Sequence, residues 1–137
     1  MDTSNLLHIY NQKLRLHQAK LNAVLQPFGL FHSQWSILYT LSEKGSMTQT
    51  EIWQYLKVEA PTVTRTLVRM EKSGWVERKV GQDKRERVVT LTEKARTTYP
   101  EILRLVKETE AWFLADLSAE ERETLQQLLE KLSTEKR

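Results

Sequence analysis

The sequence predicts a mainly α-helical fold with a small β-hairpin (α+β), arranged as a winged helix-turn-helix with further helices at both ends. Apolar residues recur at three- and four-residue spacing near both ends of the chain, which is typical of amphipathic helices. In the middle, two short helical segments meet across a tight turn, and two β-prone runs then flank a polar loop. The 137 residues contain no repeat or flexible linker, so we expect one domain, 1–137.

The first two helices are predicted from apolar stripes separated by a proline and a glycine. The first helix should end near Gln26, because Pro27 disfavours helical geometry in the residue before it. We expect Ser33 to cap a second, mostly buried helix that ends before Gly45. A loop over residues 44–47 should follow.

The third and fourth helices are predicted to form a helix-turn-helix. Thr48 and Glu51 have the spacing of a capping box, in which each side chain bonds the other residue's backbone N–H, so a helix should start there and stop by Val58. Pro61 suits the first turn of the next helix, where its missing N–H costs nothing. That helix should run to Lys72, before a glycine.

A β-hairpin and a fifth helix are expected next. The runs 75–80 and 87–91 are β-prone and are separated by a polar loop, so they predict a hairpin that would form the wing. Thr92 can cap a fifth helix that extends to Phe113. Pro100 should kink or interrupt this helix.

The last helix is predicted from another capping-box pair, Ser118 and Glu121, followed by an apolar stripe. The stripe consists of Leu125, Leu128, Leu129 and Leu132. The first and last helices carry more apolar surface than a small lobe can cover, so we expect them to pack together and to form a dimer. The segment 33–92 would then be a DNA-binding lobe, and 1–28 and 93–137 would be dimerisation helices.

Composition excludes several classes of protein and site. The chain has no cysteine, which excludes disulfides, thiolate metal sites and cysteine-based oxidant sensing. Its three histidines lack metal-ligand spacing, so we expect no metal and no cofactor. No catalytic constellation has recognisable spacing, which argues against an enzyme. No apolar run could span a bilayer and the start does not resemble a signal peptide, so we expect a cytoplasmic protein without a membrane partner.

Positive charge is concentrated in one part of the chain. Residues 62–87 contain eight basic and four acidic side chains, a net charge of +4 against +3 for the whole chain. Hydroxyls and arginines on the polar side of the fourth helix suit base edges in a major groove. The candidate DNA-binding residues there are Pro61, Thr62, Thr64, Arg65, Thr66 and Arg69. A solvated helix face is the plainer interpretation, but its coincidence with a helix-turn-helix and a basic hairpin favours duplex DNA.

The hairpin tip supplies the wing candidates Asp83, Lys84, Arg85 and Arg87. Lys84 and Arg85 are long enough to reach a minor groove, where arginine responds to groove width and negative potential. Asp83 has two interpretations that its spacing does not separate. It either orients one of the basic side chains or bonds its own backbone as an ordinary turn residue.

These residues carry a family resemblance that covers essentially the whole chain. The PTVTR run at 61–65 and the MEKSGWVER run at 70–78 resemble the winged helix of the MarR family of transcription regulators. Asp83 and Arg85, with the Leu-Thr pair at 91–92, stand at that family's wing spacing. The resemblance implies a cytoplasmic homodimer with the fourth helix in the major groove and Arg85 in the minor groove.

The resemblance also implies a small aromatic or phenolic effector, bound in a crevice between the dimer helices and the DNA-binding lobe. Candidate residues for such a crevice are His17, Trp35, Tyr39 and Trp53. Each has a plainer interpretation, because aromatic residues at helical spacing usually fill cores and a histidine in an apolar stripe is usually a core or interface residue.

We therefore expect a sequence-specific repressor that binds a roughly palindromic operator as a homodimer and is released by a small organic ligand. Two alternatives remain open. A winged-helix protein-interaction module would share the fold but should lack the concentrated basic face. A nonspecific DNA-binding protein would show steep salt dependence with little preference among sequences.

Overall fold

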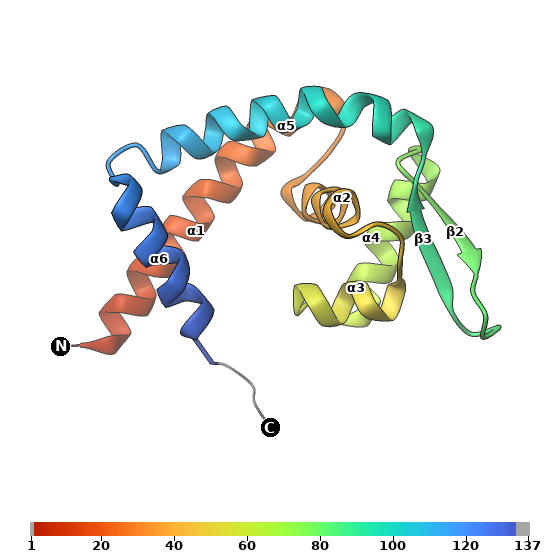
Figure 1. Ribbon diagram of the computed structural model, residues 1–137, viewed down its shortest axis with the longest axis horizontal. Coiled ribbons are helices and arrows are strands. Elements are labelled where there is room, and N and C mark those ends of the chain that lie inside the picture. The colour runs from red at the N-terminus through yellow and green to blue at the C-terminus, as the bar shows by residue number, and fades with distance from the viewer. Residues whose placement is uncertain (1, 134–137) are drawn as a thin grey trace.

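The computed structural model describes residues 2–133, which form an arch (Figure 1). Helix α5 spans the top, the α1 and α6 helices extend below one end, and a winged-helix lobe lies below the other. The elements are α1 (Thr3–Leu25), a short 3-10 turn η1 (Gln26–Phe28), α2 (His32–Lys44), β1 (Met47–Thr48), α3 (Gln49–Leu56), α4 (Ala60–Lys72), β2 (Val76–Val80), β3 (Arg87–Leu91), α5 (Glu93–Phe113) and α6 (Ala119–Lys131). The predicted fold class is confirmed, and residues 134–137 of the segment 93–137 lie outside the described residues.

Helix α1 ends where the proline predicts, but α2 begins differently from the prediction. Its first residue is His32, so the predicted Ser33 cap is wrong. Side-chain amides take that role, because Asn22 Oδ1 accepts the His32 N–H at 2.8 Å and Gln34 Oε1 accepts the Phe31 N–H at 3.0 Å. One of these acceptors comes from α1, and spacing within α2 could not reveal it.

The helix-turn-helix forms as predicted. Thr48 Oγ1 accepts the Glu51 N–H at 3.1 Å, and Glu51 Oε1 accepts the Thr48 N–H at 2.8 Å, which completes the capping box of α3. Lys57 ends α3 with a left-handed backbone (φ 59°). Pro61 lies in the first turn of α4, where its lack of an N–H leaves no intrahelical bond unmade.

The sheet has three antiparallel strands in the order β1-β3-β2. The predicted hairpin is confirmed, with a register that pairs Val76 with Leu91 and Val80 with Arg87. Strand β1 was not predicted, and the expected loop 44–47 is therefore wrong at Met47, which pairs with Val89. A two-residue strand has no periodicity of its own, and its partner lies far along the chain.

Helix α5 passes through Pro100 without interruption, so of the predicted kink or interruption, the interruption is wrong. Thr92 Oγ1 accepts the Ala95 N–H at 3.1 Å and caps the helix as predicted. Pro100 has no N–H to donate to the preceding turn, but Ile102 and Val106 just beyond it are fully buried. This burial holds the helix against the core on the far side of the proline.

The core lies in the winged-helix lobe and beneath α5. Its completely buried side chains come from α1, α3, α4, β3 and α5: Leu25, Ile52, Leu67, Met70, Val89, Ile102 and Val106. Helix α6, in contrast, has no buried residue among those described. Among residues 2–133, no helix combines the length and apolar character that crossing a bilayer requires.

Candidate nucleic-acid interface

Helix α4 divides cleanly into a core face and a solvent face. Val63, Leu67 and Met70 are at most 2% exposed and anchor the helix in the core. The predicted contact residues lie on the outward side: Pro61, Thr62, Thr64, Arg65 and Arg69 are exposed, and Thr66 is half-buried. The structure therefore brings these six residues to one polar surface that can enter a groove.

Local hydrogen bonds organise the start of this surface. Arg65 Nη2 donates to Thr62 Oγ1 at 3.3 Å, and Thr66 Oγ1 donates to the Thr62 carbonyl at 2.9 Å. Within the described residues, the first bond uses one of the five N–H groups of the guanidinium. The arginine is thus directed along the helix while most of its donors face solvent.

The wing shows that Asp83 fulfils both interpretations. Its Oδ1 accepts the Arg85 backbone N–H at 3.0 Å, as in an Asx turn, and its Oδ2 pairs with Arg85 Nη2 at 3.3 Å. The backbone hydrogen bond from Arg85, followed by the side-chain bond, holds the pKa of Asp83 below its usual value. The Arg85 side chain remains 91% exposed, so it is oriented but not buried.

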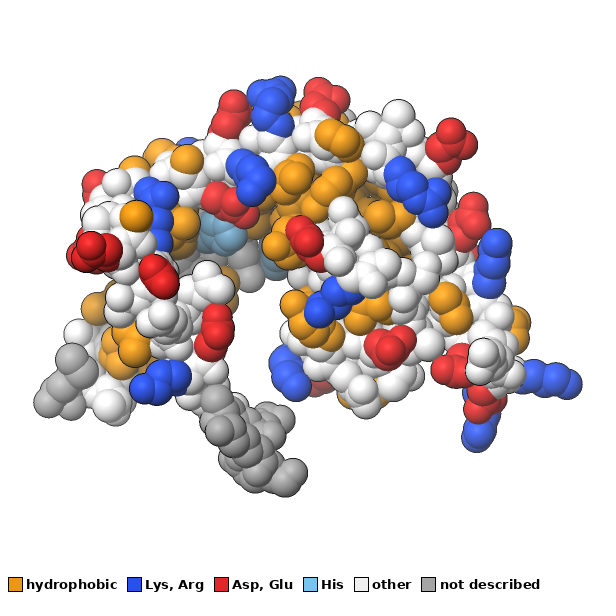
Figure 2. Space-filling model, in the orientation of Figure 1, with side chains coloured by type: hydrophobic (Ala, Val, Ile, Leu, Met, Phe, Trp, Pro, Cys, Tyr) orange, Lys and Arg blue, Asp and Glu red, His pale blue; other side chains and the backbone are white. Residues whose placement is uncertain are grey.

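Arg87 has a different position from the two basic residues before it. Its Nη1 donates to the carbonyls of Lys84 and Glu86, both at 3.1 Å, and so braces the loop from within. All three basic residues are exposed, but only Arg87 bonds these loop carbonyls among the described residues. Figure 2 shows basic side chains extending beyond the end of the hairpin.

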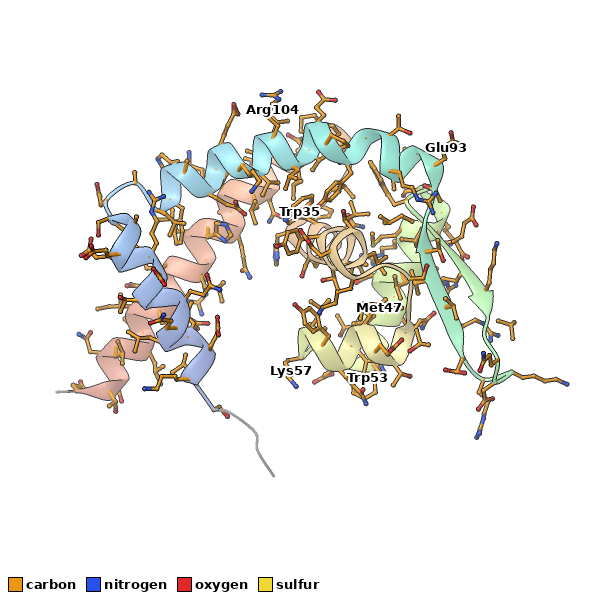
Figure 3. All side chains as sticks on the ribbon, in the orientation of Figure 1. Trp35, Met47, Trp53, Lys57, Glu93 and Arg104 are labelled. Atoms are coloured by element: carbon orange, nitrogen blue, oxygen red, sulfur yellow. The ribbon has the colours of Figure 1, made fainter. Side chains whose placement is uncertain are left out.

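The structure does not bring the four crevice candidates together. Trp35 is buried, with its ring stacked on Tyr99 at 5.5 Å, and Tyr39 lies beside it at 6.0 Å. Trp53 lies on α3, away from Trp35 (Figure 3). It lines an open groove of about 590 Å³ at the α3–α4 turn together with Pro61.

His17 lies half-buried on α1, where its ring packs on Phe113 of α5 at 4.9 Å. Burial lowers the pKa of His17, and the neighbouring His32 acts in the same direction. Glu110 opposes the shift. Figure 2 shows histidine side chains on the inner surface of the arch, between α6 and the winged-helix lobe.

A polar network that the sequence did not predict lies behind the exposed face of α4. Arg78 of β2 donates to Gln49 Oε1 and to Glu71 Oε1, both at 3.0 Å, and Gln49 Nε2 lies 3.4 Å from Thr64 Oγ1. Gln49 lies 15 and 29 residues from its partners. No local spacing signals such contacts.

Comparisons with known proteins agree with this geometry. The MarR family model matches residues 30–86. A Bacillus subtilis (strain 168) protein described as the uncharacterized HTH-type transcriptional regulator YwoH is 51% identical over 124 residues, 90% of each chain. A mutant MarR from E. coli complexed with operator DNA has a TM-score of 0.82 at 30% identity, covering 95% of this chain and 92% of that one. Reduced AbfR bound to DNA has a TM-score of 0.79 at 27% identity, covering 95% and 90%.

Proposed function

The chain belongs to the MarR family of DNA-binding transcription regulators, which are not enzymes, and we propose that it represses transcription as a homodimer on a roughly palindromic operator. One observation carries the proposal. The exposed threonine and arginine face of α4 is accompanied by a wing arginine that a carboxylate orients while leaving it 91% exposed. Hydroxyl and guanidinium donors of this kind suit base edges and phosphates. On a bacterial chromosome, such a regulator would act in the cytoplasm.

Exposed apolar side chains on α1 and α6 support the homodimer. Both helices extend from the same end of α5, away from the winged-helix lobe (Figure 1). Their exposed apolar side chains, 40% to 60% accessible, are Leu6, Leu7, Ile9, Tyr10, Leu14, Leu16, Leu125, Leu128, Leu129 and Leu132. Fully burying one such side chain is worth roughly 1.5–3 kcal/mol, so a second copy that covers this surface would be strongly bound.

A symmetric dimer determines the form of the operator. Its two-fold axis would present two copies of α4, each to a major groove on the same face of the duplex. The matching half-sites would lie about one helical turn, roughly 34 Å, apart. An inverted repeat is therefore the expected operator.

Release by a small aromatic or phenolic ligand is a further part of the proposal. It is supported by Tyr39, which is 45% exposed beside the buried Trp35, and by the half-buried pair of His17 and Phe113. A compound bound there would contact α1, α2 and α5 and so bias the position of the lobe relative to the dimer helices. Thermal-shift screening of small phenols against the wild type and Tyr39→Ala tests it: a stabilising compound should also release operator DNA.

In-vitro selection of duplex DNA from a random pool, at about physiological salt, tests the main proposal. We expect enrichment of an inverted repeat and a dimer by sedimentation analysis. Binding without enrichment would indicate a nonspecific DNA-binding protein. No binding at all would favour a winged-helix protein-interaction module.

A further inference from the structure

We propose that Gln49, the first residue of α3, is a further DNA-contacting residue whose side-chain amide is held by Arg78 and donates to an acceptor on the DNA. The inference rests on the proposed function, because it requires α4 to lie in the major groove. It adds a contact from the first helix of the motif to those expected from α4 and the wing.

Arg78 connects β2, α3 and α4 behind the exposed face of α4. From β2, its Nη1 donates to Gln49 Oε1 on α3 and its Nη2 donates to Glu71 Oε1 on α4, each at 3.0 Å. The Arg78 side chain is only 20% exposed, and its bond to Gln49 is partly shielded from water. The hydrogen bond from Arg78 holds the pKa of Glu71 below its usual value, and the pair neutralises a carboxylate that would otherwise repel phosphate.

The guanidinium fixes which way the Gln49 amide points. Arginine has only N–H donors, so the atom that faces it must be the amide oxygen. The amide nitrogen is then directed to the other side, where it lies 3.4 Å from Thr64 Oγ1 on the exposed face of α4. An amide nitrogen carries two N–H groups, and within residues 2–133 this contact accounts for one of them.

The remaining N–H lies where DNA would supply an acceptor. Gln49 is half-exposed and adjoins Thr64, which belongs to the predicted contact surface. In helix-turn-helix complexes the first helix crosses the DNA backbone while the second enters the groove. Phosphate oxygens and the major-groove edges of guanine, adenine and thymine are all acceptors, so the amide has a partner on either part of the DNA.

Gln49→Met is the primary test, because it keeps the size of the side chain and removes its donors without changing charge. Gln54→Met, at an exposed position on the same helix, is the matched control. We expect Gln49→Met to weaken binding to the selected operator by about three- to tenfold, the range of one neutral hydrogen bond, while the control binds as the wild type does. Thermal unfolding of each variant verifies that the fold is intact.

A second pair of variants separates the donor from its anchor. Gln49→Glu keeps an oxygen for Arg78 but replaces the amide nitrogen with oxygen, so it should retain the fold and weaken DNA binding more than Gln54→Glu, which adds the same charge. Arg78→Met tests the positioning role. Its effect on affinity should be smaller in the Gln49→Met background than in the wild type, because both changes disable the same contact.

Repeating the selection with Gln49→Met distinguishes the two kinds of acceptor. Loss of preference at one position in each half-site would identify a base contact, and uniform weakening across sequences would identify a phosphate contact. Either result supports the proposal. Operator binding by Gln49→Met that equals that of the wild type would overturn it. Failure of the wild type to select any sequence would instead refute the proposed function on which the inference depends.

Discussion

Two roles are open to Asp83, at the tip of the wing, and they predict opposite effects on DNA binding. As a negative charge near DNA, Asp83 should weaken binding, and its removal should strengthen it. As the residue that holds the backbone N–H and the guanidinium of Arg85, it should strengthen binding, and its removal should weaken it. The sign of the effect therefore identifies the role.

We predict that Asp83→Ala weakens operator binding by about three- to tenfold, because Arg85 loses the hydrogen bonds that orient it. Titration of labelled operator at fixed salt measures this. Glu77→Ala removes an exposed carboxylate from β2 that, within residues 2–133, pairs only with Lys79, at 3.8 Å, and it serves as the control for charge. If both variants bind more tightly by similar factors, Asp83 has no orienting role.

His17 predicts a pH dependence of stability. Its native pKa is lowered, mainly by burial, so the unfolded chain binds more protons in the window between the native pKa and the ordinary value of 6.5. Its contribution to stability is therefore fully present above that ordinary value and is lost as the pH falls towards the native pKa. Glu110 and His32 are the titratable neighbours that modulate the shift.

Urea unfolding at constant protein concentration, near pH 7.5 and near pH 5.5, tests this dependence. We expect His17→Gln to lose less stability than the wild type between the two pH values. His8→Gln, an exposed position on the same helix, should behave as the wild type does. Equal pH dependence in all three proteins would assign the effect to other groups.

At the scale of helices and strands, the first turn of α5 is joined by hydrogen bonds to the end of α4. Thr92 Oγ1 donates to the Gly74 carbonyl at 2.6 Å as well as capping α5. Lys94 Nζ donates to the Ser73 carbonyl at 2.9 Å and lies 4.5 Å above the Trp75 ring. These contacts connect α5, which leads to the proposed dimer helices, with the C-terminus of α4.

We predict that Thr92→Val lowers the free energy of unfolding by about 1–3 kcal/mol, because a helix cap and a part-buried hydrogen bond are both lost. Thr97→Val lies on the exposed side of the same helix. Among the residues that the structure describes, its hydroxyl bonds only the preceding turn, so this change should alter stability by less than about 0.5 kcal/mol. Urea unfolding of the two variants at one protein concentration gives the comparison. Equal losses would show that Thr92 acts only through helix propensity.

The sequence correctly predicted helix ends whose signals lie within one turn. It did not predict features that depend on residues far along the chain. The capping box at Thr48 and the prolines at 27 and 61 located helix ends correctly, since each acts within one turn. The α2 cap depends on Asn22 in another helix, and β1 depends on β3. The continuity of α5 depends on burial beyond Pro100, which overrides a local preference for a break.

The candidate DNA-binding surface was also predictable only in part. Exposure of residues such as Thr62 and Arg65 follows from the 3.6-residue period of α4, which the sequence shows directly. The contact between Gln49 and Arg78 requires β2 to pack beside the start of α3, and only the tertiary structure supplies that. Periodicity therefore predicts which face is presented, whereas side-chain orientation on that face requires the fold.

At the scale of the whole molecule, the arch separates two surfaces with different chemistry. The basic residues of segment 62–87 belong to the winged-helix lobe, and the exposed leucines belong to helices at the other end of α5. In the proposed dimer each copy presents one α4, so affinity for the expected inverted repeat would depend on the apolar end as much as on the basic one. Substitutions at the apolar end should therefore weaken binding to the full operator.

Leu128→Asp tests this dependence, because Leu128 is 54% exposed on α6 and would be covered by the second copy. Two-fold symmetry places the new carboxylate in the interface twice, so we predict at least a tenfold rise in the dimer dissociation constant, which is about 1.4 kcal/mol. Sedimentation analysis measures it, and operator affinity should fall in parallel. Thr124→Asp, at an exposed polar position on the same helix, should leave the dimer intact if only the leucine stripe is buried. If the dimer tolerates Leu128→Asp, the interface lies elsewhere on the arch. The geometric reason for expecting two half-sites one turn apart is then removed.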